Sequence, residues 1–532
     1  MGENVDARDG EGNTPLMMAI QKGLEEVVLC LLDNRANVNT SNEAGVTPLM
    51  LAGEVGNETI AQLLIDRGAD IHAKNNLGSS TLVWACASGN TKIATMLLDG
   101  GVDINANTGD DRTTLFVACE NGDVEMVRLF LERGSKVLSK DSEGWTPLHA
   151  ACHGGNVDVI RLLLAKGADV EARNGEGWTP LMSAASDGRT EIVDLLLSQG
   201  ADIHASKPSG ETALMLACLS DSAETVRVLI ERGADVQAKD ESGRTALLFA
   251  SMEGNADIIR LLISKGSTVN EADNMGWKPL LVACKGGKLE AAVELLSQGA
   301  DPREETARGI TPLLMASFFG ETELVRLLLE KGADMHAKRA EGESAFEIVC
   351  RLGHIDILET MLGARRIEEH RESAPNVLVR ACELKLVDVV DRLLNAGFQP
   401  NVVTEDGTTA LIEASKKDHV GIVDRLILFG ADLNLCDKDG STALIHAVKE
   451  AGEQVIQRLM MSGSDVNIPG PGGVTVLMMV CKIDWTKGVS DLLDLGADVN
   501  AVDDEGKKAI DYCKDPEIRK MLENHSLSKE TH

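Results

Sequence analysis

Cysteine is the residue whose number and spacing first suggest chemistry in this chain. There are 11 cysteines, enough for several metal sites or disulfides. Eight share one position in a pattern of about 33 residues: Cys86, Cys119, Cys152, Cys218, Cys284, Cys350, Cys382 and Cys481. Elsewhere this position holds another small residue, such as Ala185 or Ser251. Equivalent atoms of stacked units would lie roughly one helix diameter apart, too far for a disulfide or a shared zinc ion. We therefore predict reduced cysteines that pack in the interior, and no metal site.

Histidines and carboxylates show no catalytic arrangement either. His72, His204 and His336 share one repeated position, which favours a structural role. Acidic residues such as Asp141 and Glu143 fall mostly in predicted loop tips and outer helix faces. The sequence contains no phosphate-binding loop, nucleophile elbow, zinc-protease motif, paired CxxC or EF-hand loop. These observations predict a protein that is not an enzyme and needs no cofactor.

A recurring glycine defines the elements that must position all these residues. Gly12, Gly45, Gly78, Gly144, Gly177, Gly210, Gly243, Gly276, Gly309 and Gly342 share a 33-residue register, which Gly407, Gly440, Gly473 and Gly506 resume one residue short. A fixed period of this length is typical of a stack of similar units, each of which packs only against its neighbours. Sixteen such units fit the chain.

Residues 141–173 illustrate one unit. Thr146 and Pro147 are suited to the start of a helix, and the sequence His153-Gly154-Gly155 ends it. A second helix is expected from Val157, with a wide apolar face, and Gly167 should stop it. The remaining residues run extended into the next turn. Each unit is therefore predicted to be helix, turn, helix and a projecting hairpin-like loop.

The phrases around these positions resemble the ankyrin repeat. They include GNTPL, GVTPL, GWTPLHAAC and GWTPLMSAA, with the closing phrases GADVN, GADIH and GADVE. The resemblance covers residues 2–523 and implies an all-α solenoid of about sixteen tandem helix-turn-helix repeats, joined by β-hairpin-like loops into a curved superhelical stack. His149 is the only histidine in an intact TPLH phrase. The resemblance also implies that one asparagine position could be hydroxylated: Asn39, Asn105, Asn270, Asn434, Asn467 and Asn500.

The repeats predict the following organisation. Residues 1–364 hold repeats 1–11, preceded by a partial repeat at 2–7. Residues 365–377 lose the hairpin signature and are interpreted as an irregular joint. Residues 378–523 hold repeats 12–16 with a C-terminal cap, and 524–532 form a short tail.

The formal charge of −32 restricts the partners. It argues against nucleic acid, whose phosphates require Lys and Arg, and against anionic membrane surfaces. It favours solubility and is suited to a basic protein partner. No apolar run reaches membrane-helix length and no signal peptide is visible. We expect no direct membrane insertion and a cytoplasmic protein, with the nucleus as the alternative.

The residues that vary on the repeated frame are the candidate binding residues. The resemblance implies that the position before Thr-Pro and the end of the first helix line a concave contact surface. Three of the five tryptophans occupy the pre-Thr position, and aromatic anchors are typical of interface hot spots. The candidate partner-binding residues are Trp145, Trp178, Leu219, Met252, Trp277, Ile310, Phe318 and Phe319. Packing of the tryptophans over neighbouring loops is the alternative. Lys416, Lys417, Lys449 and Lys482 are interpreted as either a second, anion-attracting patch or a solvated rim.

These features predict a non-enzymatic scaffold or adaptor that binds a protein partner on its concave face, chiefly through repeats 5–10. The partner would be basic or would present an apolar peptide. The alternative is a regulatory or structural subunit of a larger assembly, such as a ubiquitin-ligase adaptor or a cytoskeletal or channel-associated complex.

Overall fold

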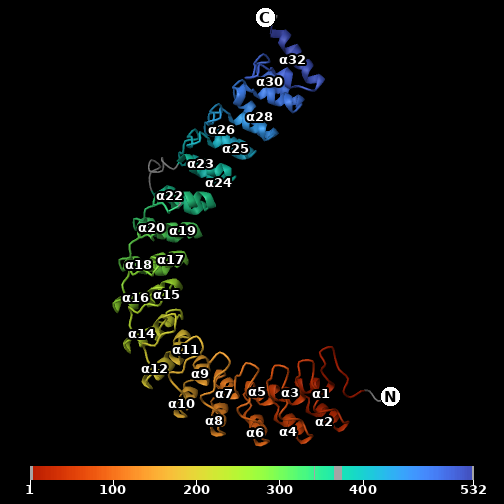
Figure 1. Ribbon diagram of the computed structural model, residues 1–532, viewed down its shortest axis with the longest axis vertical. Helices are drawn as coiled ribbons and strands as arrows, with labels where there is room; N and C mark the ends of the chain where they lie inside the picture. Colours follow the sequence, from red (N-terminus) through yellow and green to blue (C-terminus); the bar gives the residue numbers. More distant parts are fainter. Residues whose placement is uncertain (1–3, 341, 365–373, 530–532) are drawn as a thin grey trace. The chain divides into compact units, whose positions relative to one another are not determined.

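The fold consists of tandem pairs of short antiparallel helices. The computed structural model describes residues 4–340, 342–364 and 374–529. Its helices form about 15–16 pairs that follow one another along the chain (Figure 1). The chain divides into two compact units: unit 1, Met1–Ala300, and unit 2, Asp301–His532.

Unit 1 contains the helices α1 (Pro15–Gln21), α2 (Glu25–Asp33), α3 (Pro48–Val55), α4 (Glu58–Asp66), α5 (Thr81–Ala87), α6 (Thr91–Asp99), α7 (Thr114–Glu120), α8 (Val124–Glu132), α9 (Pro147–Gly154), α10 (Val157–Ala165), α11 (Pro180–Ser186), α12 (Thr190–Ser198), α13 (Ala213–Ala217), α14 (Ala223–Glu231), α15 (Ala246–Glu253), α16 (Ala256–Ser264), α17 (Pro279–Lys285) and α18 (Leu289–Ser297).

Unit 2 contains α19 (Pro312–Phe319), α20 (Thr322–Glu330), α21 (Ala345–Leu352), α22 (Ile355–Ala364), α23 (Ala374–Glu383), α24 (Val387–Asn395), α25 (Ala410–Lys416), α26 (Val420–Leu428), α27 (Ala443–Lys449), α28 (Glu453–Met461), the 3-10 turn η2 (Pro471–Gly473), α29 (Val476–Lys482), α30 (Thr486–Asp494), α31 (Ala509–Tyr512) and α32 (Pro516–Lys529).

Local sequence signals mark the start of many of the helices. The Thr179 side chain accepts a hydrogen bond from the Met182 backbone N–H at 3.3 Å, and Pro180 begins α11, where no donor is needed. Asn caps serve several second helices in the same way, as at Asn90, which accepts from the Ile93 N–H at 2.9 Å. These contacts satisfy donors that a helix start leaves unpaired.

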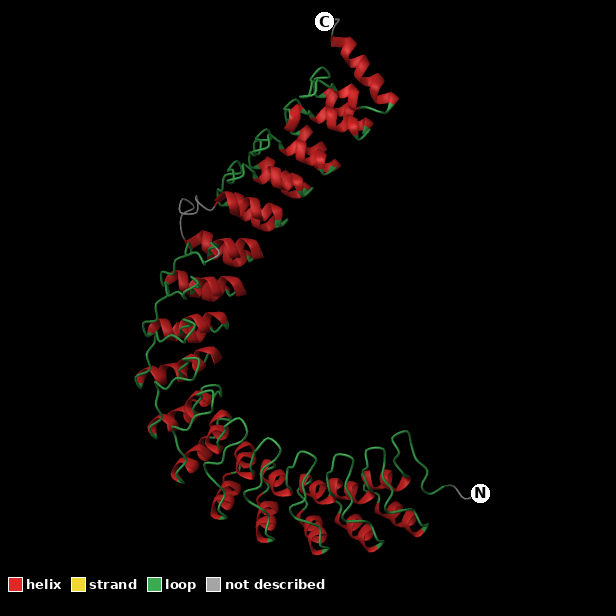
Figure 2. Ribbon diagram, viewed as in Figure 1, coloured by secondary structure: helices red, strands yellow, loops and turns green. Residues whose placement is uncertain are grey.

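The loops between pairs are tight and alike. The Asp141 carboxylate accepts the backbone N–H groups of Glu143 and Trp145, at 3.0 and 2.8 Å, while Gly144 adopts a positive φ of 86° that suits glycine. Neighbouring loops are joined by single backbone hydrogen bonds, such as Gly175 N–H to the Glu143 carbonyl at 2.8 Å. Isolated antiparallel bridges occur in some loops, and the described residues contain no β-sheet (Figure 2).

Each pair buries its apolar surface against the pairs on either side. Helix α9 contacts α7 and α11, and α10 contacts α8 and α12. The eight cysteines of the shared position are all buried, as expected for packing residues. The serines at this position are buried too. Ser251 Oγ donates to the Leu247 carbonyl at 2.7 Å, and Ser415 Oγ donates to the Leu411 carbonyl at 2.8 Å. The predicted all-α architecture of tandem helix pairs is confirmed.

One irregular joint was expected from the sequence, at residues 365–377. Residues 365–373 of the predicted joint lie outside the described residues, and residues 374–377 form the first turn of α23. The Pro-Gly-rich segment before α29 contains the short turn η2. In the described part of the chain, no helix combines the length and the apolar character that crossing a bilayer requires.

Candidate functional site

The candidate site lies on the side of each unit formed by the first helices of the pairs. We call this the first-helix face. It comprises the pre-Thr residue and the residues about four and eight positions later, which lie on the same side of the helix because a turn takes 3.6 residues. In the fifth repeat these are Trp145, His149 and His153. In unit 1 the first helices lie along one side of the stack and the second helices along the other (Figure 1).

Trp145 and Trp178 lie next to each other on this face of unit 1. Both are half-buried, and their ring centroids are 6.1 Å apart. The indole N–H of Trp145 donates to Glu143 at 3.1 Å, and that of Trp178 donates to Glu176 at 3.2 Å. The tryptophans therefore pack partly within the array while part of each ring stays open to solvent.

The two rings line a cavity of about 250 Å³ between α7, α9 and α11. Phe116, Glu120 and Asp187 also line it. On one side of the cavity the Arg112 guanidinium lies 5.0 Å from the Phe116 ring centroid. The cavity thus combines aromatic surface with charged groups of both signs.

His149 connects the rings to the next repeat. Its Nδ1 lies 2.8 Å from the Thr146 hydroxyl, and its Nε2 lies 3.0 Å from the Trp178 carbonyl oxygen. Burial lowers the pKa of His149 from 6.5 to about 4, although the hydrogen bond to Trp178 acts in the opposite direction. The imidazole is therefore neutral at physiological pH and links two repeats.

Trp277 and Met252 line a second, separate cavity of unit 1, with a volume of about 630 Å³. Met275, at the adjacent loop tip, is 73% exposed and also lines it. The Lys285 ammonium lies 5.0 Å from the Trp277 ring centroid. This arrangement offers an apolar hollow with a cation at one side.

The remaining candidates lie apart from these cavities. Leu219 is exposed and lines a different hollow, together with the carboxylates of Asp221 and Glu253. Ile310, Phe318 and Phe319 belong to unit 2 and its own first-helix face. Phe318 and Phe319 are exposed at the end of α19, with ring centroids 5.2 Å apart.

The pattern of the chain matches one family throughout most of its length. The family model described as "Ankyrin repeats (3 copies)" matches residues 1–75, 82–174, 171–240, 237–306, 287–371 and 378–470. The chain belongs to the ankyrin repeat family. No individual curated protein gives a match to it. Residues 471–529 continue the helix-pair pattern beyond the matched segments.

The asparagine position of these ankyrin repeats links successive loops. Asn467 accepts the Asp498 backbone N–H at 2.7 Å and donates to the Gly496 carbonyl at 3.3 Å. Asn39 makes the same two bonds to Asp70 and Gly68, at 2.7 and 3.1 Å. This position therefore has a structural role, while its hydroxylation stays a prediction.

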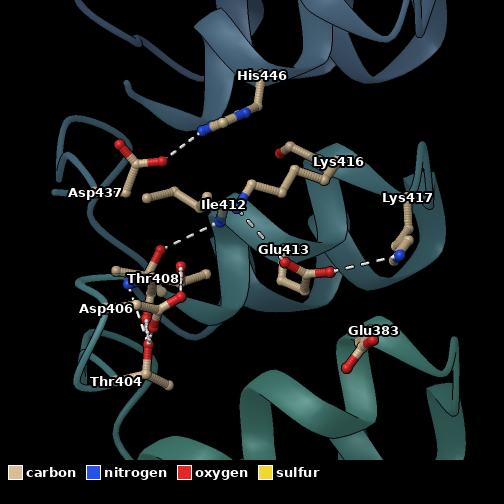
Figure 3. A network of polar contacts seen from close by, with 12 residues as sticks. Glu383, Thr404, Asp406, Thr408, Ile412, Glu413, Lys416, Lys417, Asp437 and His446 are labelled. Carbon is tan, nitrogen blue, oxygen red and sulfur yellow. Dashed lines mark hydrogen bonds and ion pairs between the residues drawn. The ribbon is translucent and has the colours of Figure 1, made fainter. Parts of the chain in front are cut away.

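The lysines of the second candidate patch lie on the first-helix face of unit 2. Lys416 and Lys417 both approach the Glu413 carboxylate, at 3.8 Å each (Figure 3). Lys449 donates to the Ser441 hydroxyl at 3.1 Å, and Lys482 is exposed.

His446 lies close to the lysines of this patch, and their charges affect its pKa. It lies 2.6 Å from Asp437 (Figure 3). Burial lowers the pKa of His446, and the charges of Lys416 and Lys449 act in the same direction. Lys416 and Lys417 are partly neutralised by their ion pairs with Glu413. The lysine patch is therefore less basic than its sequence suggests.

Sequence reasoning did not single out Arg112, Phe116 and Met275 as site residues. The available signal was the helical spacing itself. Phe116 is four residues after Arg112, as His149 is four residues after Trp145, so a search at this spacing from the pre-Thr position would have found it. Met275 could not be found by helical spacing, because its place beside the cavity depends on the conformation of the loop. Among the described residues, no group of three or more His, Cys, Asp or Glu side chains is arranged to hold a metal ion.

Proposed function

We propose that this chain is a non-enzymatic protein-interaction scaffold or adaptor that binds a protein partner on its first-helix faces, chiefly through repeats 5–10. Ankyrin repeats generally build protein-binding scaffolds, and the matched family is typically non-catalytic. The proposal assigns the partner contacts to Trp145, Trp178, Leu219, Met252, Trp277, Ile310, Phe318 and Phe319.

The observation that carries the proposal is the half-buried pair Trp145 and Trp178 beside a cavity. Their indole N–H groups are held by Glu143 and Glu176, so the rings are fixed before a partner arrives. Rigid aromatic anchors lose little conformational entropy on binding and dominate interface energetics. A ring that served packing alone would be covered by neighbouring side chains, as Phe130 is, at 0% exposed.

The partner's chemistry follows from charge and surface. The chain carries a formal charge of −32, which attracts basic proteins and speeds their encounter. The hollow beside Met252 and Trp277 favours an apolar side chain. We therefore propose a partner that is basic or presents an apolar peptide, in the cytoplasm or the nucleus.

The test is a pull-down with the full chain as bait, followed by affinity measurement with the proteins recovered. The variant Trp145→Ala/Trp178→Ala should weaken partner binding by at least about 2 kcal/mol, a hot-spot magnitude, which is about 30-fold. Phe318→Ala/Phe319→Ala reports separately on unit 2. Val293→Ala is the control, because Val293 is exposed on the second helix α18.

Each outcome has a distinct meaning. Equal affinities of both aromatic variants and the wild type, with unchanged helical circular dichroism, would remove the site assignment. Recovery of a stoichiometric multi-subunit complex would favour the alternative, a subunit of a larger assembly.

A further inference from the structure

The cavity between α7, α9 and α11 has the composition of a specific subsite. We propose that it accepts one arginine side chain of the protein partner. The inference rests on the proposed function of the first-helix face, and it adds the chemical identity of the residue that this cavity recognises.

The size of the cavity suits one side chain. Its volume is about 250 Å³, below the roughly 300 Å³ at which pockets for whole small-molecule ligands begin. It is bounded by the first helices of three successive repeats, and its lining combines the rings of Phe116, Trp145 and Trp178 with longer charged side chains. A single long side chain of a partner would fill it.

The aromatic walls favour a cation. Indole faces attract guanidinium and ammonium groups, and a planar guanidinium also stacks on them. The chain itself shows this preference on the same face: the Lys207 ammonium lies 4.8 Å from the Trp178 ring centroid, and Arg112 lies 5.0 Å from that of Phe116.

Two carboxylates are fixed at the exposed edge of the tryptophan pair. Glu143 and Glu176 each accept one indole N–H through Oε2, at 3.1 and 3.2 Å. Both glutamates are exposed. Each therefore keeps acceptor capacity for a further donor, and the two indole bonds hold the carboxylates in place.

Two more carboxylates line the cavity itself. Glu120 lies 3.5 Å from Arg112, and Asp187 lies 2.8 Å from His153. Arg112 also lies 3.2 Å from Asp110, so its charge is divided between at least two carboxylates. One arginine therefore faces several carboxylates, and the local balance of charge is negative.

These features select arginine among the basic residues. Its guanidinium has five N–H donors in a planar fork, so it can stack on an indole while donating to carboxylates at the edge. Lysine offers a point charge without the stacking plane. An apolar side chain would use the rings but would leave the remaining acceptor capacity of the carboxylates unused, and it is the competing occupant that the test must exclude.

The experiment is a titration of the full chain followed by the indole N–H signals in NMR. The chain has five tryptophans, and Trp→Phe variants assign their signals. The probes are N-acetyl-arginine amide, N-acetyl-lysine amide and N-acetyl-leucine amide. The arginine probe should shift the Trp145 and Trp178 signals saturably and bind at least about fivefold more tightly than the leucine probe.

Charge variants separate the arginine subsite from a general aromatic surface. Glu143→Gln/Glu176→Gln keeps an acceptor for each indole N–H and removes two charges, so arginine-probe binding should weaken by about two- to fivefold for each charge removed. Glu11→Gln is the matched control, because Glu11 occupies the same loop position in the first repeat, beside Asn13.

Equal shifts with the leucine and arginine probes, no shift with either, or unchanged arginine affinity in the double glutamine variant would each overturn the subsite. These outcomes are distinct from a failure of the proposed function. Weakened partner capture by Trp145→Ala/Trp178→Ala without arginine preference would refute the subsite alone, whereas unchanged capture would refute the binding surface.

Discussion

His149 should make the stability of the central repeats of unit 1 depend on pH. The side chain is 1% exposed, and it bridges Thr146 and the Trp178 carbonyl in its neutral form. Its pKa is lowered by burial from 6.5 to about 4. Between these two values the locally unfolded segment binds a proton that the folded segment does not, so stability falls as the pH falls.

The expected size follows from the two pKa values. At pH 7 the histidine is almost entirely neutral in the folded state and about three-quarters neutral in the unfolded state, and at pH 5 it is protonated mainly in the unfolded state. The free energy of local unfolding should therefore decrease by about 2 kcal/mol between pH 7 and pH 5. The loss should begin near pH 6.5 and be complete near pH 4.

Native-state hydrogen exchange read by mass spectrometry suits the measurement, because repeat arrays open locally rather than in one step. The reference variant is His149→Met, since Met182 occupies the equivalent position in the next repeat. At pH 7 it should lower the local stability by about 1–2 kcal/mol through the lost hydrogen bonds. Between pH 7 and pH 5, the local stability of the variant should fall by about 2 kcal/mol less than that of the wild type.

Two results would refute this reasoning. The first is an identical pH dependence of exchange in α9 and α11 for the wild type and the variant. The second is an NMR titration in which the His149 ring protonates near pH 6.5.

Three further predictions concern packing. Gly210→Ala should lower the stability by more than Gly200→Ala. Both glycines have a positive φ, 89° and 91°, which costs an alanine about 1–2 kcal/mol, but a Cβ at Gly210 would also lie 2.7 Å from the Asp240 Cα, whereas nothing lies within 4 Å of a Cβ at Gly200. Equal melting temperatures of the two variants would contradict this prediction. A thiol reagent at pH 8 should label Cys30 and Cys436 quickly, since these thiols are exposed. The eight cysteines of the shared repeat position should react slowly, because they are buried and burial raises the pKa of thiols such as Cys152. Rapid labelling of these eight cysteines would contradict their packing in the interior. Asn467→Ala should destabilise the last repeats by about 1–2 kcal/mol through two lost loop bonds, as read by hydrogen exchange. Asn500→Ala should destabilise them by less, because within the described residues its side-chain amide accepts from the Lys508 ammonium and bonds to no following loop. The reverse order would disprove the role of this position.

The helix pairs could be predicted because their signals are local. Thr179 and Pro180 mark a helix start through contacts within a few residues, and Gly144 permits the turn through its own backbone. The shared cysteine position was predictable for a related reason: identical units must pack small residues where first helices approach, and Ser251 can replace cysteine there because its hydroxyl bonds to Leu247.

The site was less predictable because it depends on side-chain directions across repeats. The sequence grouped Trp178, Leu219 and Met252 by position, yet these residues line three different hollows. Glu143, the partner of the Trp145 indole N–H, was expected to be a solvated loop residue. Helical spacing places residues on one face, but cavities form where the particular side chains of adjacent repeats leave space.

The most direct test of the central claim is a hydrogen-exchange footprint of the full chain with and without its recovered protein partner. The account predicts protection in α9, α11 and their preceding loops, with the second helices α10 and α12 unchanged. Protection confined to the second helices, or absent from residues 141–186, would contradict the claim that the first-helix face of unit 1 binds the partner.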